Sequence, residues 1–303
     1  MACKKCGPDP VMRLSSGVKL CRSCFIKYFE KKVRKTLRIF SLIEAKERIA
    51  VAVSGGKDSI SVLSILNDIA SKKKHFQLFA ILIDEGISGY REHTIATAKS
   101  FCEERNIPLH VYSFKKEFGY TLDEMVKKLG MKPCTICGVF RRYLLNRAAR
   151  ELKADKLVTG HNMDDEAQSV LMNQFKSNIG LSARLGPITG VKTDRRFVRR
   201  IKPLYMVSEK EVALYALLKN LRGKHNECTY ENLSFRGEIR DMLNYLEDKH
   251  HGVKNNVINS YLEIMPVLKE KYKTEDQINS CLKCNEPTSG DVCAACELLA
   301  KLK

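Results

Sequence analysis

Long apolar runs are absent from this sequence of 303 residues. No segment approaches the roughly 18 consecutive apolar residues of a membrane-spanning helix, and the amino-terminal sequence MACKKCGPDP has no hydrophobic segment typical of a signal peptide. Hydrophobic residues make up 44% of the chain and charged residues 29%, a balance that excludes disordered and collagen-like proteins. We therefore expect a cytoplasmic globular protein whose length corresponds to about two domains.

Acidic residues are also scarce, with 35 Asp and Glu against 53 Lys and Arg, which gives a net charge of +18. This excess favours a large polyanionic partner, although a basic surface that only keeps the protein soluble is an alternative. Basic residues cluster in 27–38 and in 192–202, and such clustering favours contacts with a nucleic-acid backbone. Because apolar residues alternate with the basic ones in 27–38, a helix that lies on a membrane surface is a further alternative.

Cysteine is abundant, with 12 residues, and in a reducing cytosol thiols bind metals more readily than they form disulfides. Two sets of paired C-x2-C motifs lie near the two ends of the chain: Cys3, Cys6, Cys21 and Cys24, and Cys281, Cys284, Cys293 and Cys296. Four thiolates suit a tetrahedral Zn²⁺, so we predict two structural zinc sites, with a four-cysteine iron–sulfur cluster or a redox dithiol as the alternatives. Both segments are too short to form a core, so we expect them to fold only with metal.

The other cysteines divide into two kinds. Cys102 lies on the apolar face of a predicted helix, and we interpret it as a core residue. Cys134 and Cys137 form a third C-x2-C motif, and Cys228 follows much later in the chain. If these last three thiols converge, they indicate a site with chemistry of its own.

Short apolar segments alternate with helical segments through the middle of the chain. The pattern predicts strands at 49–53, 78–83, 109–112 and 156–159, and helices at 60–70, 91–105, 121–129 and 139–152. This alternation predicts an α/β fold, in which helices cover both faces of a parallel sheet and ligands bind at the carboxyl ends of the strands. Three further helical segments are predicted: a long basic helix over 25–47, a helix that opens with a capping box at 208–211, and a region over 236–272.

The sequence SGGKDS occupies 54–59, between a predicted strand and a predicted helix. Glycines in such a turn allow backbone N–H groups to approach a phosphate, and the start of the helix favours the negative charge. The segment is not a Walker loop, because Val51 occupies the position of the first glycine and Asp58 follows Lys57. It therefore predicts a nucleotide site of another kind, with a glycine turn that only packs helix on strand as the alternative.

At these residues the sequence resembles the PP-loop ATP pyrophosphatase group, whose SGGxDS loop binds ATP and whose members act on several different acceptors. Further motifs at 133–142, 159–167, 202–204 and 227–228, together with both terminal cysteine sets, resemble the tRNA 2-thiouridine synthetase family. Within it, 137–142, 170–173 and 230–240 are most similar to the cytosolic branch that acts on the wobble uridine at tRNA position 34, rather than to the branch that acts on the T-loop uridine at position 54. The resemblance implies a Rossmann-like PP-loop fold and ATP-dependent tRNA thiolation.

In the reaction that this resemblance implies, ATP adenylylates O2 of the uridine and sulfide then displaces AMP at C2. Backbone contacts to adenosine are implied for Ala52, Val53, Ser54 and Ile83. A phosphate cradle is implied for Gly55, Gly56, Asp58 and Ser59, with Lys57 and Arg141 as the positive groups that stabilise developing charge. Gly160 would let the backbone approach the nucleotide. Asp164 or Asp165 would hold Mg²⁺, although the helix dipole alone also favours acidic residues in a first turn.

Members of this family use the cysteines corresponding to Cys134, Cys137 and Cys228 to bind a 4Fe-4S cluster, and one iron then has no protein ligand. Such an open iron is suited to carrying sulfide, and a persulfide on one cysteine, released as a disulfide by another, is the alternative. The expected partners are tRNA, a second copy of the chain in a homodimer, and a sulfur donor that is either a ubiquitin-like thiocarboxylate carrier or free sulfide. The segments 27–38 and 192–202 are the expected contacts with the tRNA backbone.

The expected organisation has five parts: an amino-terminal zinc module (1–26), a basic linker helix (27–46), the PP-loop catalytic domain (47–220), a helical region that carries the third cluster cysteine (221–275), and a carboxyl-terminal zinc module (276–303). Two other functions stay open on the sequence alone. A PP-loop enzyme with a different acceptor would not need the three cysteines, and a zinc-ribbon nucleic-acid-binding module would keep the nucleotide loop only as a vestige.

Overall fold

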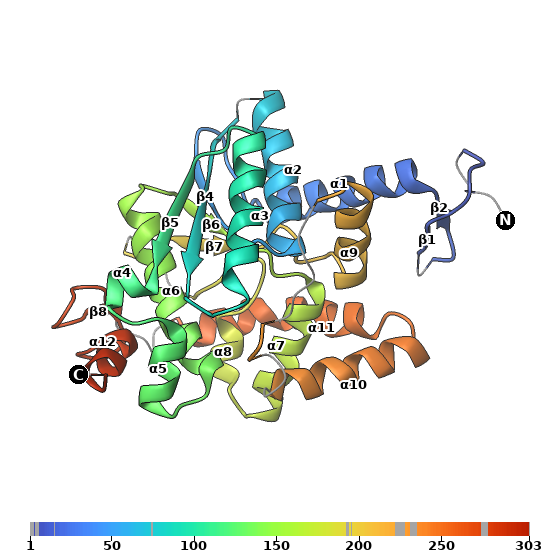
Figure 1. Ribbon diagram of the computed structural model, residues 1–303. Helices are drawn as coiled ribbons and strands as arrows, with labels where there is room; N and C mark the ends of the chain where they lie inside the picture. Colours follow the sequence, from blue (N-terminus) through green and yellow to red (C-terminus); the bar gives the residue numbers. More distant parts are fainter. Residues whose placement is uncertain are drawn as a thin grey trace.

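A parallel sheet of five strands lies at the centre of the described residues in the computed structural model (Figure 1). The structure describes residues 3, 6–14, 16–73, 75–191, 194, 196–221, 228–230, 235–273 and 278–302. The strands lie in the order β5-β4-β3-β6-β7, with the bounds Leu109–Ser113, Gln77–Asp84, Arg48–Ala52, Lys156–Val158 and Arg199–Ile201. All neighbouring strands are parallel. The α/β fold and the four predicted strands are confirmed.

The edge strand β7 is not predicted by the sequence pattern. Two of its three residues, Arg199 and Arg200, are charged, whereas buried parallel strands are usually apolar throughout. Only Ile201 is fully buried, and it pairs with Val158 of β6. Because an edge strand has one open side, it accommodates arginines whose side chains leave the core.

The sheet separates two hydrophobic cores, and β3 shows how. Ile49 and Val51 face one core, whereas Ala50 between them faces the other, as the two-residue period of a strand requires. The first core is closed by α1 (Arg22–Ile39), α2 (Lys57–Lys73), α3 (Arg91–Glu104) and α9 (Glu209–Leu218), and the second by α4 (Phe114–Phe118), α5 (Leu122–Leu129) and α6 (Pro133–Glu151). Cys102 is buried in the first core, as predicted.

A third group of helices lies below the carboxyl ends of the strands in the view of Figure 1. It consists of α7 (Met163–Phe175), α8 (Ile179–Ala183), α10 (Phe235–Lys249) and α11 (Val253–Lys271). Residues of α7, α10 and α11, together with Tyr205, form a small core around Ala167 and Leu243. None of the described helices combines the length and the hydropathy that crossing a membrane requires.

Several predicted helix boundaries are wrong. The helix expected over 25–47 ends at Ile39, because Ser41 and Lys46 adopt positive φ angles of 47° and 68° that no helix continues through. The helical region predicted over 236–272 is confirmed, and it consists of two helices, α10 and α11, separated by a turn in which Gly252 has a φ of 97°. The helix expected from 139 begins at Pro133, since proline fits the first helical position.

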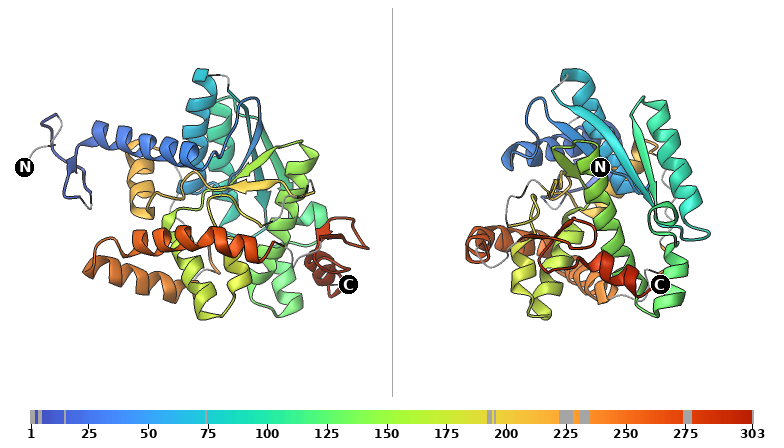
Figure 2. Two further views of the ribbon diagram at one scale, coloured as in Figure 1. Left: turned by 180° about the vertical axis from the view of Figure 1, so that it is seen from behind. Right: turned by 90° about the vertical axis from the view of Figure 1, so that its left-hand side faces the viewer.

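The two cysteine-rich modules lie on opposite sides of the molecule (Figure 2). The amino-terminal module, with β1 (Met12–Arg13) and β2 (Lys19–Leu20), stands at the outer end of α1. The carboxyl-terminal module, with β8 (Asn279–Ser280), β9 (Pro287–Thr288) and α12 (Ala294–Ala300), packs against α6. A salt bridge between Arg150 of α6 and the buried Glu286 holds it there.

Candidate active site and metal centres

Two of the predicted motifs meet at the carboxyl edge of the sheet. β3 and β6 are neighbours, but the chain continues from β3 toward β4 on one side and from β6 toward β7 on the other. In open α/β sheets, ligands bind where the strand order reverses in this way. The SGGKDS loop follows β3 and the segment 159–165 follows β6, so both lie at this point, as predicted.

A cavity of about 1130 Å³ opens beside these motifs. Its walls come from the SGGKDS loop, from α7, α9, α10 and α11, and from residues 12–14 of the amino-terminal module. Ser54, Gly56 and Lys57 line it on the loop side, and Cys228 lines it as well. Because small-molecule pockets usually measure roughly 300–1,000 Å³, this cavity has room for a nucleotide and a second group.

The SGGKDS loop is held in shape by its own serines. The Ser54 N–H donates to Ser59 Oγ at 3.2 Å, and Ser59 Oγ donates to the Gly56 carbonyl at 3.0 Å. Gly55 has a φ of 84°, and a Cβ at this position would lie 2.0 Å from the carbonyl oxygen of Thr94 in α3. Glycine is therefore required at Gly55 both by backbone conformation and by the close approach of α3.

The loop after β6 packs directly on the start of α2. A Cβ at Gly160 would lie 2.9 Å from the backbone nitrogen of Ser59, so glycine here allows contact between two backbones. Asn162 then caps α7 by accepting the Asp165 N–H at 3.1 Å, and its amide donates to Asp58 Oδ1 at 3.0 Å. Asn162 thus connects the two predicted motifs, a role that its place in the sequence does not indicate.

Lys57 points at two carboxylates. Its Nζ lies 3.1 Å from Asp58 Oδ2 and 3.0 Å from Oε1 of Glu209, the first residue of α9. Burial lowers the pKa of Lys57, but the two carboxylates outweigh it, and the net shift is upward. Lys57 is therefore protonated at neutral pH. Glu209 belongs to a segment far away in the sequence, and sequence analysis did not find it as a site residue.

The two aspartates at the start of α7 have different roles. Asp164 is buried, forms a salt bridge with Lys254 of α11 and accepts the Glu209 N–H at 2.8 Å, so its carboxylate is engaged in structure. Asp165 lines the cavity, as Asp164 does; its Oδ2 accepts the Asn162 N–H at 3.1 Å, and its Oδ1 lies 3.9 Å from Arg236 Nη1. Desolvation raises the pKa of Asp165 to about 6. The cationic neighbour of Asp165 is farther away than that of Asp164, so Asp165 is the better placed of the two to interact with a cation in the cavity.

The three cysteines outside the terminal sets lie in one region of the structure. Pro133 opens α6, so Cys134 and Cys137 lie in its first turns. Cys134 Sγ lies 3.8 Å from the carbonyl oxygen of Tyr230, two residues after Cys228, and Cys137 and Cys228 both pack against the second core. Burial raises the pKa of Cys137 to about 11, so metal binding at this thiol must displace a proton.

Arg141 extends from α6 one turn after Cys137. Its Nη1 lies 3.7 Å from Oε1 of Glu85, a buried residue that follows β4. The charge of Arg141 also interacts with the thiols of Cys137 and Cys228. Arg141 therefore lies near both Cys137 and Glu85 at the end of β4, although it is not among the residues that line the cavity.

Of the positions expected to frame adenosine, Ala52 ends β3 and Ile83 lies near the end of the adjacent β4. Several of their backbone groups already have partners. The Val53 N–H donates to the Ile81 carbonyl at 2.8 Å, and Arg91 donates to the carbonyls of Ile83 and Ser54. Adenosine contacts at these positions stay a prediction.

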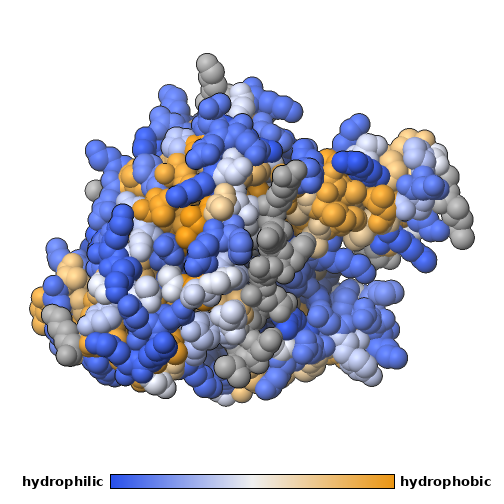
Figure 3. Space-filling view, in the orientation of Figure 1, coloured by the Kyte–Doolittle hydropathy of each residue, from blue (hydrophilic) through white to orange (hydrophobic). Residues whose placement is uncertain are grey.

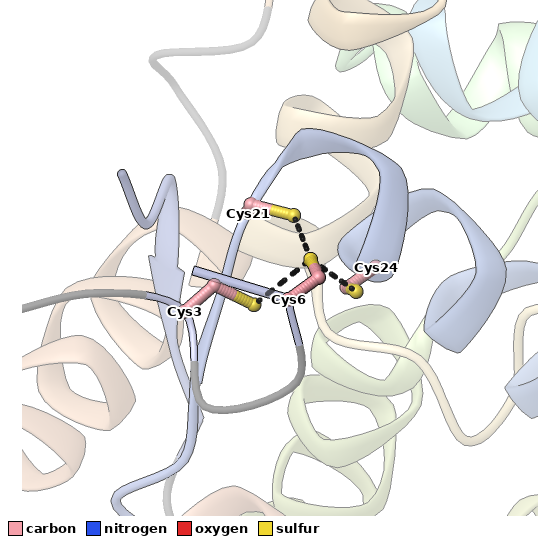
Figure 4. Close-up of side chains that lie close together, drawn as sticks. All are labelled: Cys3, Cys6, Cys21 and Cys24. Carbon is pink, nitrogen blue, oxygen red and sulfur yellow. Dashed lines mark hydrogen bonds between the residues drawn. The ribbon is translucent and has the colours of Figure 1, made fainter. Parts of the chain in front are cut away.

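The terminal cysteines form two compact quartets. In the amino-terminal set, Cys6 Sγ lies 3.8, 3.4 and 3.5 Å from the sulfurs of Cys3, Cys21 and Cys24 (Figure 4). In the carboxyl-terminal set, the sulfurs of Cys284 and Cys293 are 3.7 Å apart. Zinc–sulfur bonds of about 2.3 Å in a tetrahedron place sulfurs about 3.8 Å apart. Across the described ranges, these two quartets are the only groups of three or more potential metal ligands within 4.8 Å of one another, and each could hold one metal ion.

The predicted basic segments differ in availability. Lys27, Lys31 and Lys35 are exposed on α1. In the second segment, Lys202 is buried and paired with Glu166 at 2.7 Å, so its ammonium group is not exposed on the surface. Lys192 and Arg195 of the same segment lie outside the described residues, as do Glu227 and 231–234 of the family motifs. On the face shown in Figure 3, hydrophilic side chains cover α10, and an apolar area lies over α1 and α9.

The model of the PP-loop domain family matches residues 27–246. The tRNA 2-thiolation protein NcsA of Haloferax volcanii is 38% identical over 319 residues, and the alignment covers 100% of this chain and 99% of that protein. This chain belongs to the PP-loop family of tRNA 2-thiolation proteins.

Further relatives carry related names. The cytoplasmic tRNA 2-thiolation protein 1 of Dictyostelium discoideum is 38% identical, with 99% of this chain and 83% of that protein covered. The tRNA-5-methyluridine(54) 2-sulfurtransferase of Pyrococcus horikoshii is 37% identical, with 98% and 93% covered. Among solved structures, the U34-tRNA thiolase NcsA from Methanococcus maripaludis with its [4Fe-4S] cluster matches with a TM-score of 0.82 and 37% identity, covering 98% of this chain and 95% of that one. The family assignment made from the sequence motifs is confirmed.

Proposed function

We propose that this protein is an ATP-dependent tRNA thiolase that converts the wobble uridine, position 34, to 2-thiouridine in the cytoplasm. One observation carries the proposal: the SGGKDS loop and Cys228 line the same cavity. A loop suited to ATP and a cysteine that family members use for a cluster therefore face one space, where activation and sulfur transfer can follow each other on a single base. The Methanococcus structure supports position 34 by its name, and the Pyrococcus relative makes position 54 the alternative to test.

The proposed chemistry proceeds in two displacements. Uridine O2 attacks the α-phosphorus of ATP, an O–P bond forms and pyrophosphate leaves. Sulfide then attacks C2, the C2–O2 bond breaks, and AMP leaves with the original O2. Adenylylation converts a poor leaving oxygen into part of a stable phosphate, which explains why thiolation consumes ATP.

Residues of this chain assist each displacement. Lys57 belongs to the SGGKDS loop and is the first residue of α2. Its positive charge and the amino-terminal end of the helix would stabilise charge on the departing pyrophosphate. Arg141, close to Cys137, would stabilise the phosphate of the adenylylated uridine during the second displacement. Mg²⁺, when bound with ATP, would neutralise phosphate charge, and Asp165 is the carboxylate placed to hold it.

The cysteine arrangement supports a cluster site. When bound by Cys134, Cys137 and Cys228, a 4Fe-4S cluster supplies an iron without a protein ligand, at which sulfide is delivered. Each cysteine ligates a different iron of such a cube, so the three thiols need not approach as closely as the four of a single-ion site. This is consistent with their being in one region without forming a quartet like the terminal sets. For the terminal quartets themselves we propose zinc, one ion each.

The proposal is tested by reconstituting the protein anaerobically with ATP, Mg²⁺, sulfide and tRNA transcripts that retain uridine only at position 34 or only at position 54. Thiouridine and AMP are quantified by mass spectrometry for the wild type, for Cys228→Ala and for Cys102→Ala, a matched change of a buried cysteine outside the site. We expect thiouridine with the position-34 transcript from the wild type and Cys102→Ala, and none from Cys228→Ala.

Other outcomes contradict defined parts of the proposal. Thiouridine with the position-54 transcript alone refutes the wobble assignment. Product formation by Cys228→Ala refutes the role of the three cysteines. AMP without thiouridine refutes free sulfide as a sufficient donor and points to a thiocarboxylate carrier, and the absence of AMP from protein that carries its cluster refutes the ATP chemistry.

A further inference from the structure

A buried pair of charges lies between the SGGKDS loop and the cysteine-bearing helix α6. Glu85 follows β4 and Arg91 opens α3, and their side chains are only 6% and 4% exposed. Arg91 Nε lies 2.7 Å from Glu85 Oε2. A buried ion pair contributes little net stability compared with apolar packing, so stability alone does not account for charges at this place.

Arg91 joins the loop to the sheet. Its Nη1 donates to the Ser54 carbonyl at 2.9 Å and to Thr94 Oγ1 at 2.9 Å, and its Nη2 donates to the Ile83 carbonyl. Thr94 is also the residue whose carbonyl leaves no space for a Cβ at Gly55. The guanidinium thus fixes the first residue of the nucleotide loop against the end of β4 and the start of α3.

The second oxygen of Glu85 faces the other side of the site. Glu85 Oε1 lies 3.7 Å from Nη1 of Arg141, whose side chain is 51% exposed. The backbone of Glu85 is itself held, because its carbonyl accepts the Leu122 N–H at 2.7 Å. One rigid carboxylate therefore contacts both the arginine that holds the nucleotide loop and the arginine beside the cysteines.

We propose that Glu85 is a positioning residue that orients Arg141 relative to the bound nucleotide. Arg141 has a long side chain with half of its surface in solvent, and without an anchor its guanidinium would sample many positions. Glu85 anchors it, while the pair with Arg91 ties that anchor to Ser54 of the loop. This inference deepens the proposed function and rests on it, because it concerns the second displacement of the thiolation reaction.

A double-mutant cycle tests the inference. Glu85→Gln, Arg141→Ala and the double variant are compared for kcat of thiouridine formation and for KM of ATP. We expect Glu85→Gln to lower kcat by about ten- to a hundredfold, the scale of a misplaced catalytic group. In the Arg141→Ala background, the same change should leave kcat unaltered, because the group that Glu85 orients is gone. Glu85→Gln also weakens the anchor of Arg91, which holds Ser54 of the nucleotide loop. Any rise in KM for ATP caused in this way should appear both with Arg141 present and in the Arg141→Ala background.

Glu286→Gln is the matched control. Glu286 is also a buried carboxylate, with a side chain 6% exposed, and it also pairs with an arginine of α6, but at the end that faces the carboxyl-terminal module. It should lower the unfolding midpoint without changing kcat. If Glu85→Gln does not fold, Glu85→Asp, which keeps the charge beside Arg91 with a shorter reach, is used in the same cycle.

Two results would overturn the inference. Effects of Glu85→Gln and Arg141→Ala on kcat that multiply independently would show that Glu85 does not act through Arg141. A kcat loss in Glu286→Gln as large as in Glu85→Gln would show a general structural effect. Failure of the proposed function is distinguishable, because the wild type itself would then form no thiouridine, whereas failure of the positioning role leaves wild-type thiolation intact.

Discussion

Replacement of Gly55 by alanine should be the most damaging single-methyl change in the nucleotide loop. The φ of 84° places an L-residue in the left-handed region, which costs about 1–2 kcal/mol. The new Cβ would also lie 2.0 Å from the Thr94 carbonyl oxygen, a backbone atom of α3 that can yield only if the helix shifts. Overpacking of this kind costs about 1–3 kcal/mol. We therefore expect Gly55→Ala to lower the free energy of unfolding by about 2–5 kcal/mol.

Gly119→Ala separates the two contributions. Gly119 has nearly the same φ, 82°, at the end of α4, but nothing lies within 4 Å of a Cβ there. Only backbone strain should act, at about 1–2 kcal/mol. Both variants and the wild type are unfolded in urea with their metals bound, and ATP binding is measured by calorimetry. Gly55→Ala should be the less stable variant and should lose ATP binding, whereas Gly119→Ala should retain it. Equal stability of the two variants would refute the packing argument.

Three further changes test other contacts. Gly160→Ala places a Cβ 2.9 Å from the Ser59 nitrogen and should raise KM for ATP about tenfold, as a displaced loop would; an unchanged KM would contradict the packing of the two loops. Glu209→Gln removes one of the two carboxylates that face Lys57 and should lower KM for ATP, because the phosphates then compete with one carboxylate fewer; a higher KM would show that Glu209 assists binding. Cys6→Ser should reduce bound zinc, measured by atomic emission spectrometry, from two equivalents to one; unchanged zinc would contradict the amino-terminal site.

The parts of the fold that could be predicted are those whose signal is local. The strands β3, β4, β5 and β6 are short apolar runs, and burial on both faces requires such runs wherever helices cover a parallel sheet. The SGGKDS loop could also be predicted from its own residues, since phosphate binding needs both the glycines and the helix that follows them. Helix ends were less predictable. The end of α1, for example, is followed by Ser41 and Lys46, which adopt positive φ angles although neither serine nor lysine favours them.

Contacts between distant segments could not be predicted from local patterns. Glu209 faces Lys57 only because α9 begins beside the loop, and Asn162 reaches Asp58 only because β6 lies next to β3. For the same reason the sequence could not distinguish Asp164 from Asp165. Their difference arises from Lys254, which lies on α11 and neutralises one of the two.

The central claim is that O2 of the uridine is adenylylated before sulfur replaces it, and an isotope measurement tests it most directly. A tRNA transcript with ¹⁸O at O2 of uridine 34 is incubated anaerobically with the protein, ATP, Mg²⁺ and a sulfur source, and the AMP is examined by mass spectrometry. The account predicts one ¹⁸O in the phosphate of AMP for each thiouridine formed, since the C2–O2 bond breaks and the O2–phosphorus bond is kept. Thiouridine accompanied by AMP without ¹⁸O would contradict it.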